Sequence, residues 1–216
     1  MDFITYLEQR LHEPLPGLRA HRQFVPAIPD AAKRLAAPPD GARQSAVLVP
    51  LIEMAGILPS IMLTLRSEHL RNHKGQISFP GGRVDDGEEI IDAALRELDE
   101  EVGIAPDDVV VLGTLSPLYI PPSNSAVTPV VGRVHIPEHY RLSEAEVQEV
   151  FLLHLSDLID PANVAEEPWT LYGQSVNVPH WKVHPAAPLW GATAMILNEL
   201  IFIAREYMDI ITDERQ

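Results

Sequence analysis

Residues 82–104 form an acidic, amphipathic segment that constrains the structure of this chain more than any other feature. Their sequence is GRVDDGEEIIDAALRELDEEVGI, in which Asp85, Asp86 and Gly87 are typical of a turn and Gly103 suits a helix C-terminus. Five apolar residues between them recur at helical spacing and predict a buried stripe: Ile91, Ala94, Leu95, Leu98 and Val102. The segment therefore predicts a loop, a helix and a stop.

Three glutamates of this predicted helix share one face. At about 100° per residue, Glu97, Glu100 and Glu101 fall within roughly a 100° arc away from the apolar stripe, so we expect them to face outward. Like charges at this spacing repel, although Arg96 can offset part of the repulsion. An acidic face of this kind is usually solvated. The alternative is a divalent cation such as Mg²⁺, which prefers carboxylate oxygens as ligands.

The fixed positions across this segment follow a long spaced pattern. Five residues separate Gly82 from Glu88, and seven separate Glu88 from the Arg96 triplet. The pattern continues through Leu98, Glu100, Glu101, Gly103 and Ile104. It resembles the Nudix box, the signature of hydrolases that act on nucleoside diphosphates linked to another moiety. Every fixed position is filled, which favours the metal-binding interpretation of the acidic face.

The resemblance implies a role for each residue of the box. Glu97, Glu100 and Glu101 would bind Mg²⁺ or Mn²⁺ together with the backbone of Gly82, where the missing side chain permits close approach. Arg96 would complete the catalytic group by orienting these carboxylates through hydrogen bonds. The number of metal ions, and the carboxylate that acts as general base, stay open.

A second pattern runs directly into the box. Residues 62–67, MLTLRS, are followed by Arg71, Gly75 and the sequence FPGG at 79–82. This run resembles the additional motif of the coenzyme A pyrophosphatase branch of the Nudix family. Met62 replaces the usual first leucine, a volume-conserving exchange. The resemblance implies hydrolysis of the diphosphate bond of coenzyme A or its thioesters, which gives 3′,5′-ADP and 4′-phosphopantetheine or its acylated form.

Basic side chains of the second motif favour phosphate binding. The formal net charge of the chain is −15, yet five basic residues gather here: Arg66, His69, Arg71, His73 and Lys74. Arginine forks onto phosphate oxygens, and coenzyme A carries a diphosphate and a 3′-phosphate. A basic polar loop that arises by chance is the alternative. The residues predicted to contact substrate are Arg66, Arg71, His73, Phe79 and Gly81.

Residues outside the two motifs give weaker signals. Glu146, between Glu144 and Glu149, lies where the chain enters a predicted strand and is a candidate extra metal ligand or base. A solvated surface cluster is the alternative interpretation. Tyr119 and Asn124 are candidates for the wall of a nucleotide pocket.

Strands and helices are intermixed along the remaining chain, which indicates an α/β or α+β fold. Besides the box helix, we expect an amphipathic helix at 3–11, a Pro- and Ala-rich lead-in with a short helical piece at 26–42, two buried strands within 46–65, strands at 109–118, 127–135 and 149–155, a loop at 119–124, a helical turn at 155–159 and a helix at 190–207. Trp190 is expected to pack in the core. The resemblance narrows the fold to a Nudix α/β/α sandwich with a central mixed β-sheet. We expect a single domain over 1–216, in which 1–42 lead into a core of 43–216.

Composition narrows the functional classes. The chain contains no Cys, which excludes disulfides and thiol nucleophiles and agrees with a reducing cytoplasm. Its N-terminus lacks the basic start and apolar run of a signal peptide, so we expect a cytoplasmic protein. The acidic charge disfavours nucleic acid and anionic membrane surfaces as partners. The expected partner is a small-molecule diphosphate such as coenzyme A, and a homodimer is compatible with the sequence.

Two alternative functions remain. A Nudix pyrophosphatase for ADP-ribose or another nucleoside diphosphate derivative would keep the box but has no need of the upstream motif. A non-catalytic Nudix module that senses nucleotides would keep the fold but could lose its glutamates, all of which are present here.

Overall fold

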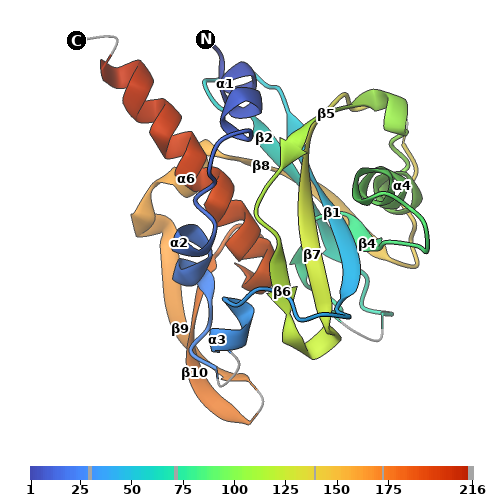
Figure 1. Ribbon diagram of the computed structural model, residues 1–216, viewed down its shortest axis with the longest axis vertical. Helices are drawn as coiled ribbons and strands as arrows, with labels where there is room; N and C mark the ends of the chain where they lie inside the picture. The colour runs from blue at the N-terminus through green and yellow to red at the C-terminus, as the bar shows by residue number, and fades with distance from the viewer. Residues whose placement is uncertain (29–30, 71–72, 139, 172, 214–216) are drawn as a thin grey trace.

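A mixed β-sheet with helices on both faces forms the centre of the molecule (Figure 1). The computed structural model describes residues 1–28, 31–70, 73–138, 140–171 and 173–213. Within them the main path of the sheet runs β3 (Ile77–Ser78), β2 (Ser60–Arg66), β1 (Arg43–Ile52), β7 (Ser125–Val134) and β5 (Val109–Thr114). Three strands pair beside this path, β4 (Gly81–Arg83) with β1, β6 (Leu118–Ile120) with β7 and β8 (Val147–His154) with β2. Strands β1 and β7 are parallel, whereas the other pairs are antiparallel.

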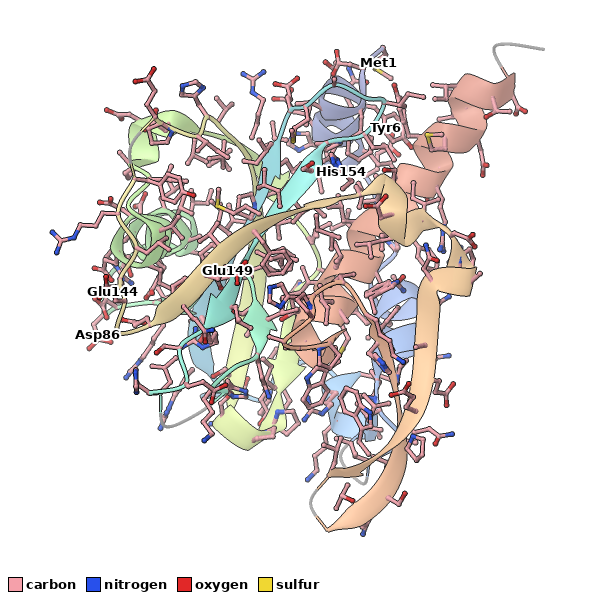
Figure 2. All side chains as sticks on the ribbon, turned by 180° about the vertical axis from the view of Figure 1, so that it is seen from behind. Met1, Tyr6, Asp86, Glu144, Glu149 and His154 are labelled. Carbon is pink, nitrogen blue, oxygen red and sulfur yellow. The ribbon has the colours of Figure 1, made fainter. Side chains whose placement is uncertain are left out.

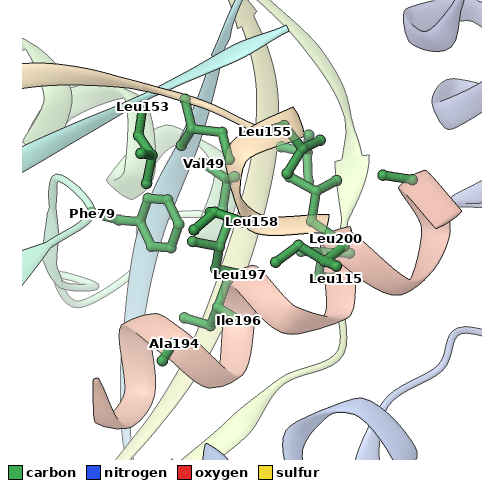
Figure 3. Packing of buried hydrophobic residues seen from close by; sticks show 14 of the residues in the cluster. Val49, Phe79, Leu115, Leu153, Leu155, Leu158, Ala194, Ile196, Leu197 and Leu200 are labelled. Carbon is green, nitrogen blue, oxygen red and sulfur yellow. The ribbon is translucent and has the colours of Figure 1, made fainter. Parts of the chain in front are cut away.

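The central strand β1 is buried on both faces, which explains its nearly continuous apolar sequence. Successive side chains alternate between faces, so Leu48 packs in the cluster beneath α4 (Ile90–Val102). Val49 packs instead with α6 (Gly191–Asp213) and α1 (Phe3–Arg10). Figure 3 shows Phe79 directed into this second cluster, above α6. The expected α/β/α sandwich with a mixed sheet is confirmed.

A smaller sheet, not predicted from the sequence, stands beside the main one. It consists of β9 (Val164–Leu171), β10 (Gln174–Trp181) and β11 (Leu189–Trp190) in antiparallel order. The N-terminal lead-in, the segment that precedes β1, packs against this sheet through Phe24, which stacks on Trp181 with ring centroids 3.9 Å apart. The remaining short elements are α2 (Leu18–His21), η1 (Arg22–Phe24), α3 (Ala31–Arg34), η2 (Pro106–Asp108), η3 (Pro121–Ser123), α5 (Ser156–Ile159) and η4 (Pro161–Asn163).

Several predicted boundaries need correction. The single strand expected at 109–118 is two strands, β5 and β6. Strand β6 ends at Ile120 and therefore includes the first two residues of the loop expected at 119–124. Strand β8 begins at Val147 rather than Glu149, because its pairing with β2 extends to the end of that strand. Helix α6 continues to Asp213, beyond the expected end at 207. The two buried strands expected within 46–65 are confirmed as β1 and β2.

Among the helices in the described part of the chain, none has the length and apolarity needed to cross a membrane.

Candidate functional site

The box folds as a strand, a turn, a helix and a stop. Strand β4 leads through a turn at Gly87, where φ is 83°, into α4, which begins at Ile90. Gly103 ends the helix in the left-handed conformation (φ 76°), and its N–H donates to the Asp99 carbonyl at 2.8 Å. A Cβ at this position would also overlap the backbone of Arg141. The predicted loop, helix and glycine C-cap are therefore confirmed.

Arg96 connects the acidic residues of the box. Its Nε donates to Glu88 Oε1 at 2.8 Å, and its Nη1 donates to Glu97 Oε1 and Glu100 Oε2, both at 3.0 Å. Its Nη2 also donates to the Arg83 carbonyl at 3.0 Å. The hydrogen bonds to Glu88 and Glu97 raise the pKa of Arg96, so the guanidinium stays charged. One arginine therefore relieves the repulsion on the acidic face and fixes two of its carboxylates.

Glu101 was predicted to face outward, but the prediction is wrong, because only 2% of the residue is exposed. The segment that precedes β8 covers this end of α4, and the Ser143 N–H donates to the Glu101 carbonyl at 3.0 Å. Burial raises the pKa of Glu101 to about 7, Arg66 opposes the shift, and Glu146 and Glu97 add to it. Its Oε2 is buried without a hydrogen-bond partner among the described residues. The predicted apolar stripe is shifted accordingly, because Ile91 is exposed and Ala93 is buried in its place.

The other two glutamates differ in exposure. The Glu97 side chain is 15% exposed, and burial raises its pKa despite the hydrogen bond from Arg96. The Glu100 side chain is 60% exposed. Gly82 lies so close to Glu97 that a Cβ there would overlap the carboxylate. A Cβ at Gly81 would similarly overlap Val47, so both glycines are required by packing against their neighbours.

A β-bulge places Arg66 beside Glu101. The pairing of β2 with β8 shifts register between Leu65 and Arg66, and such bulges redirect the side chain at the end of a strand. The Arg66 Nη1 lies 3.6 Å from Glu101 Oε1. Its Nε is buried and has no hydrogen-bond partner among the described residues. Arg66 thus combines an ion pair with a buried donor that no described residue uses.

Glu146 approaches the box carboxylates, whereas its two acidic neighbours do not. Its charge raises the pKa of both Glu97 and Glu101, and its carbonyl accepts from the Ser67 N–H at 2.8 Å. Figure 2 shows Glu144 at the outer edge of the molecule and Glu149 farther along β8. Both are exposed, and Glu149 Oε2 lies 3.4 Å from His184 Nε2.

A cavity of about 490 Å³ extends from the glycines of the box toward the smaller sheet. Four of the five residues predicted to contact substrate line it: Arg66, His73, Phe79 and Gly81. Arg71 lies outside the described residues. Tyr119 donates to Asn124 Oδ1 at 2.8 Å, and neither lines the cavity, although Ile120 and Ser123 between them do.

Other parts of the cavity wall were not predicted from the sequence. Arg34 in α3 and Arg83 in β4 line it, but neither stands at a spacing that marks a phosphate ligand. Trp190, expected in the core, packs against the buried residues Val176 and Val178 and contacts the Trp169 ring at a centroid distance of 5.3 Å, but it is only half-buried and also lines the cavity. The sequence motif correctly predicted that Gly81 lines the cavity. It could not predict Arg34 or Trp190, because these wall residues lie far from the motif in sequence.

The donor set of the box fits a hard divalent cation. Carboxylate oxygens are the preferred ligands of Mg²⁺, Glu101 supplies a buried oxygen without a partner, and only a glycine fits beside Glu97 at position 82. Among the described residues no three His, Asp or Glu side chains already converge as a metal cluster. Arg96 Nη1 instead lies between Glu97 and Glu100. Binding an ion would therefore require these side chains to rearrange.

Comparisons with known proteins identify the family of the chain. Residues 42–172 match the NUDIX domain family. The uncharacterized Nudix hydrolase NudL of Citrobacter koseri is 43% identical over 162 residues, which cover 73% of this chain and 81% of that protein. NudL of Escherichia coli strain SMS-3-5 is 41% identical over 160 residues, with the same coverage of both chains.

Solved structures of Nudix proteins also resemble the chain. The Nudix hydrolase RenU of M. smegmatis aligns with a TM-score of 0.50 and 17% identity, over 77% of this chain and 88% of RenU. This likeness concerns the fold alone. The family match covers more than half of the chain, and the NudL relatives exceed 40% identity over most of it. The chain therefore belongs to the Nudix hydrolase family.

Proposed function

We propose that this protein hydrolyses the diphosphate bond of coenzyme A or its thioesters, releasing 3′,5′-ADP and 4′-phosphopantetheine or its acylated form. One observation carries the proposal: a cationic cavity opens beside the carboxylates of the box in a strongly acidic chain. Three arginines line it, Arg34, Arg66 and Arg83, and no Asp or Glu is among the described residues of its wall. Such a wall favours a ligand with several phosphates.

The size and polarity of the cavity agree with this substrate class. Its volume of about 490 Å³ lies within the usual range for small-molecule sites. Apolar side chains form the part next to the smaller sheet, including Ile28, Leu171 and Trp190. Coenzyme A combines a charged nucleotide half with a long, less polar pantetheine arm. The cavity offers both environments within one chamber.

The residues of the box divide the catalytic work. Glu97, Glu100 and Glu101, with the backbone of Gly82, would hold Mg²⁺ or Mn²⁺, which would neutralise phosphate charge and activate water for attack. Arg96 orients the carboxylates, because its guanidinium already bonds two of them. Glu146 is the candidate extra ligand or base, since its charge adds to the effect of burial in raising the pKa of Glu97 and of Glu101.

The second motif binds the substrate in this proposal. Arg66 presents an unpartnered Nε to the diphosphate. Gly81 lets the backbone approach it, while Phe79 and His73 form adjoining parts of the wall. Arg71 is assigned to the same role from the motif alone. We further propose that residues 1–216 act as a single domain, because the lead-in residues Phe3 and Phe24 share the core of the main sheet.

The test is a substrate panel with Mg²⁺ present. Initial rates are measured for coenzyme A, acetyl-coenzyme A, ADP-ribose, NADH and dinucleoside polyphosphates, with products separated by chromatography. We expect the highest kcat/KM for coenzyme A or its thioester, with 3′,5′-ADP as a product. Preference for ADP-ribose or another substrate would refute the coenzyme A assignment but keep a Nudix pyrophosphatase.

A variant of the box separates an enzyme from a binding module. Glu100→Gln removes a carboxylate whose side chain is largely exposed, so the fold should persist while most of kcat is lost. Asp99→Asn is the matched control, because Asp99 is an exposed acidic neighbour on the same helix. Wild-type protein that hydrolyses no diphosphate would favour the non-catalytic sensor.

A further inference from the structure

We propose that Arg34 is a specificity-determining residue that binds a phosphate monoester of the substrate, remote from the diphosphate that is cleaved. Arg34 lies in α3, before the segment that matches the NUDIX domain family. The inference rests on the proposed function, which supplies a substrate with a third phosphate.

Arg34 lines the cavity with a donor that the chain leaves unused. Its Nε is buried and has no hydrogen-bond partner among the described residues. A buried donor without a partner costs free energy, which a ligand that accepts from it recovers. Arg66 is the other cavity arginine with a buried, unpartnered Nε. The cavity therefore offers two separate arginine donors for anionic groups.

The two arginines approach the cavity from different elements. Arg66 ends β2 and lies 3.6 Å from Glu101 of α4, so it belongs to the end where the diphosphate is cleaved. Helix α3 lies away from α4, on the side of the main sheet that carries α2 and α6 (Figure 1). Ile120 at the end of β6 and Pro122 and Ser123 just after it form the cavity wall near α3, which contacts β6. This placement assigns Arg34 to an anionic group other than the cleaved diphosphate.

The lead-in that carries Arg34 is anchored to the rest of the fold. His21 Nε2 lies 3.2 Å from Glu199 of α6, and Phe24 stacks on Trp181 of β10. The Asn198 amide also donates to the Ala20 carbonyl at 2.8 Å. These contacts hold residues 20–24, upstream of α3, against α6 and β10, which limits the conformational cost of presenting Arg34 to a ligand.

A phosphate monoester suits this guanidinium. Arginine presents a planar fork of donors that matches phosphate oxygens and stays charged at all relevant pH values. In coenzyme A the monoester is the 3′-phosphate of the ribose, which is separated from the diphosphate by the sugar. A diphosphate substrate without the monoester would leave Arg34 unpaired in the cavity wall and would bind less tightly.

The test crosses a substrate change with a side-chain change. Steady-state kinetics with Mg²⁺ compare coenzyme A with 3′-dephospho-coenzyme A for wild type, Arg34→Gln and Lys33→Gln. Lys33 is an exposed neighbour that does not line the cavity, so its variant controls for the loss of one positive charge. We expect Arg34→Gln to lower kcat/KM for coenzyme A about 10- to 100-fold, mainly through KM, and to change the dephospho substrate by less than about threefold.

Binding without turnover gives a second measurement. Calorimetry in metal-free buffer compares 3′,5′-ADP with 5′-AMP, and wild type is expected to bind 3′,5′-ADP at least about tenfold tighter. Arg34→Gln should remove this preference, whereas Lys33→Gln should keep it. Equal losses on both substrates, or a binding preference that survives Arg34→Gln, would overturn the inference. If wild type fails to hydrolyse coenzyme A, the proposed function fails and the binding comparison alone decides the role of Arg34.

Discussion

Glu101 in α4 and Glu199 in α6 are both helical glutamates withdrawn from solvent, with 2% and 0% of each exposed. Glu199 is surrounded by donors: Gly17 N–H at 2.6 Å, Ser116 N–H at 3.0 Å and Ser116 Oγ at 2.7 Å. His21 Nε2 lies 3.2 Å away on the same carboxylate. Glu101 has a guanidinium nitrogen at 3.6 Å and one oxygen without a partner among the described residues.

The pKa values of the two carboxyl groups move in opposite directions. Burial raises the pKa of Glu101 to about 7, because Arg66 only partly offsets the loss of solvent. Burial also acts to raise the pKa of Glu199, but hydrogen bonds from His21 and Ser116 overcome it and hold the pKa below its usual value. Hydrogen bonding, rather than burial alone, therefore decides whether the charged form is stabilised.

The difference separates a structural carboxylate from one suited to a ligand. Glu199 joins the N-terminal lead-in to α6 and to the chain after β5, with its acceptor capacity in use. Glu101 retains an oxygen that a cation can use, at a cost to the stability of the ligand-free protein. Functional sites often carry such a cost.

Glu101→Gln gives the largest expected effect. We expect kcat for the best diphosphate substrate to fall by about 10³-fold, because the proposed carboxylate ligand and its charge are lost. Mg²⁺ should raise the Tm of the wild type and leave the Tm of the variant nearly unchanged. Differential scanning calorimetry with and without Mg²⁺ makes this measurement independent of activity.

Glu199→Gln is the matched change at the other buried carboxylate. It should lower the free energy of unfolding. It should preserve kcat, measured well below the melting temperature of the variant, and it should preserve the Mg²⁺-dependent rise in Tm. Loss of the Mg²⁺ response in this variant, or its retention in Glu101→Gln, would contradict the division between the two sites.

The stability of the metal-free protein should depend on pH through both groups, with opposite signs. The pKa of Glu101 rises from 4.5 to about 7, so its contribution is full below pH 4.5 and is lost as pH rises through 7. A shift of this size corresponds to about 3 kcal/mol. The lowered pKa of Glu199 gives a contribution that is present above pH 4.5 and is lost as pH falls through the folded-state value.

Chemical denaturation from pH 2 to 9 in the presence of a chelator measures both contributions. Glu101→Gln should remove the decline in unfolding free energy between pH 5 and 8, and Glu199→Gln should reduce the loss on the acid side. A wild-type decline that persists in Glu101→Gln would assign the effect to another group.

Local sequence predicted the box helix but not the environment of its last glutamate. Apolar spacing and a glycine stop are properties of neighbouring residues, so α4 and its C-cap could be predicted. The burial of Glu101 depends on Ser143 and the chain before β8, which reach α4 only in the folded protein. Helical periodicity within α4 cannot predict that a segment distant in sequence will bury one of its residues.

The cavity shows the same limit. Its arginines at 66 and 34 come from a recognisable motif and from an unremarkable lead-in, and only the first could be predicted. Its apolar wall includes Leu171 of β9, a strand that was not predicted. Glu199 likewise stood within an apolar helical pattern, and its partners at 17, 21 and 116 gave no signal in sequence.

Ser116→Ala gives the smallest expected effect and tests how the Glu199 site distributes its stabilisation. The variant removes the Oγ donor at 2.7 Å but keeps the backbone N–H of residue 116 and of Gly17. A hydrogen bond to a charged group contributes about 2 kcal/mol, so Tm should fall by about 4–8 °C in a chain of this length. Ser175→Ala, on an exposed position of β10, is the control and should change stability by less than about 0.5 kcal/mol. Activity should persist, since Ser116 does not line the cavity. If the hydrogen bonds of Glu199 are purely structural, Ser116→Ala should lower the free energy of unfolding and leave kcat unchanged. A loss of kcat without a loss of stability would instead show that the Glu199 site affects catalysis at Glu101.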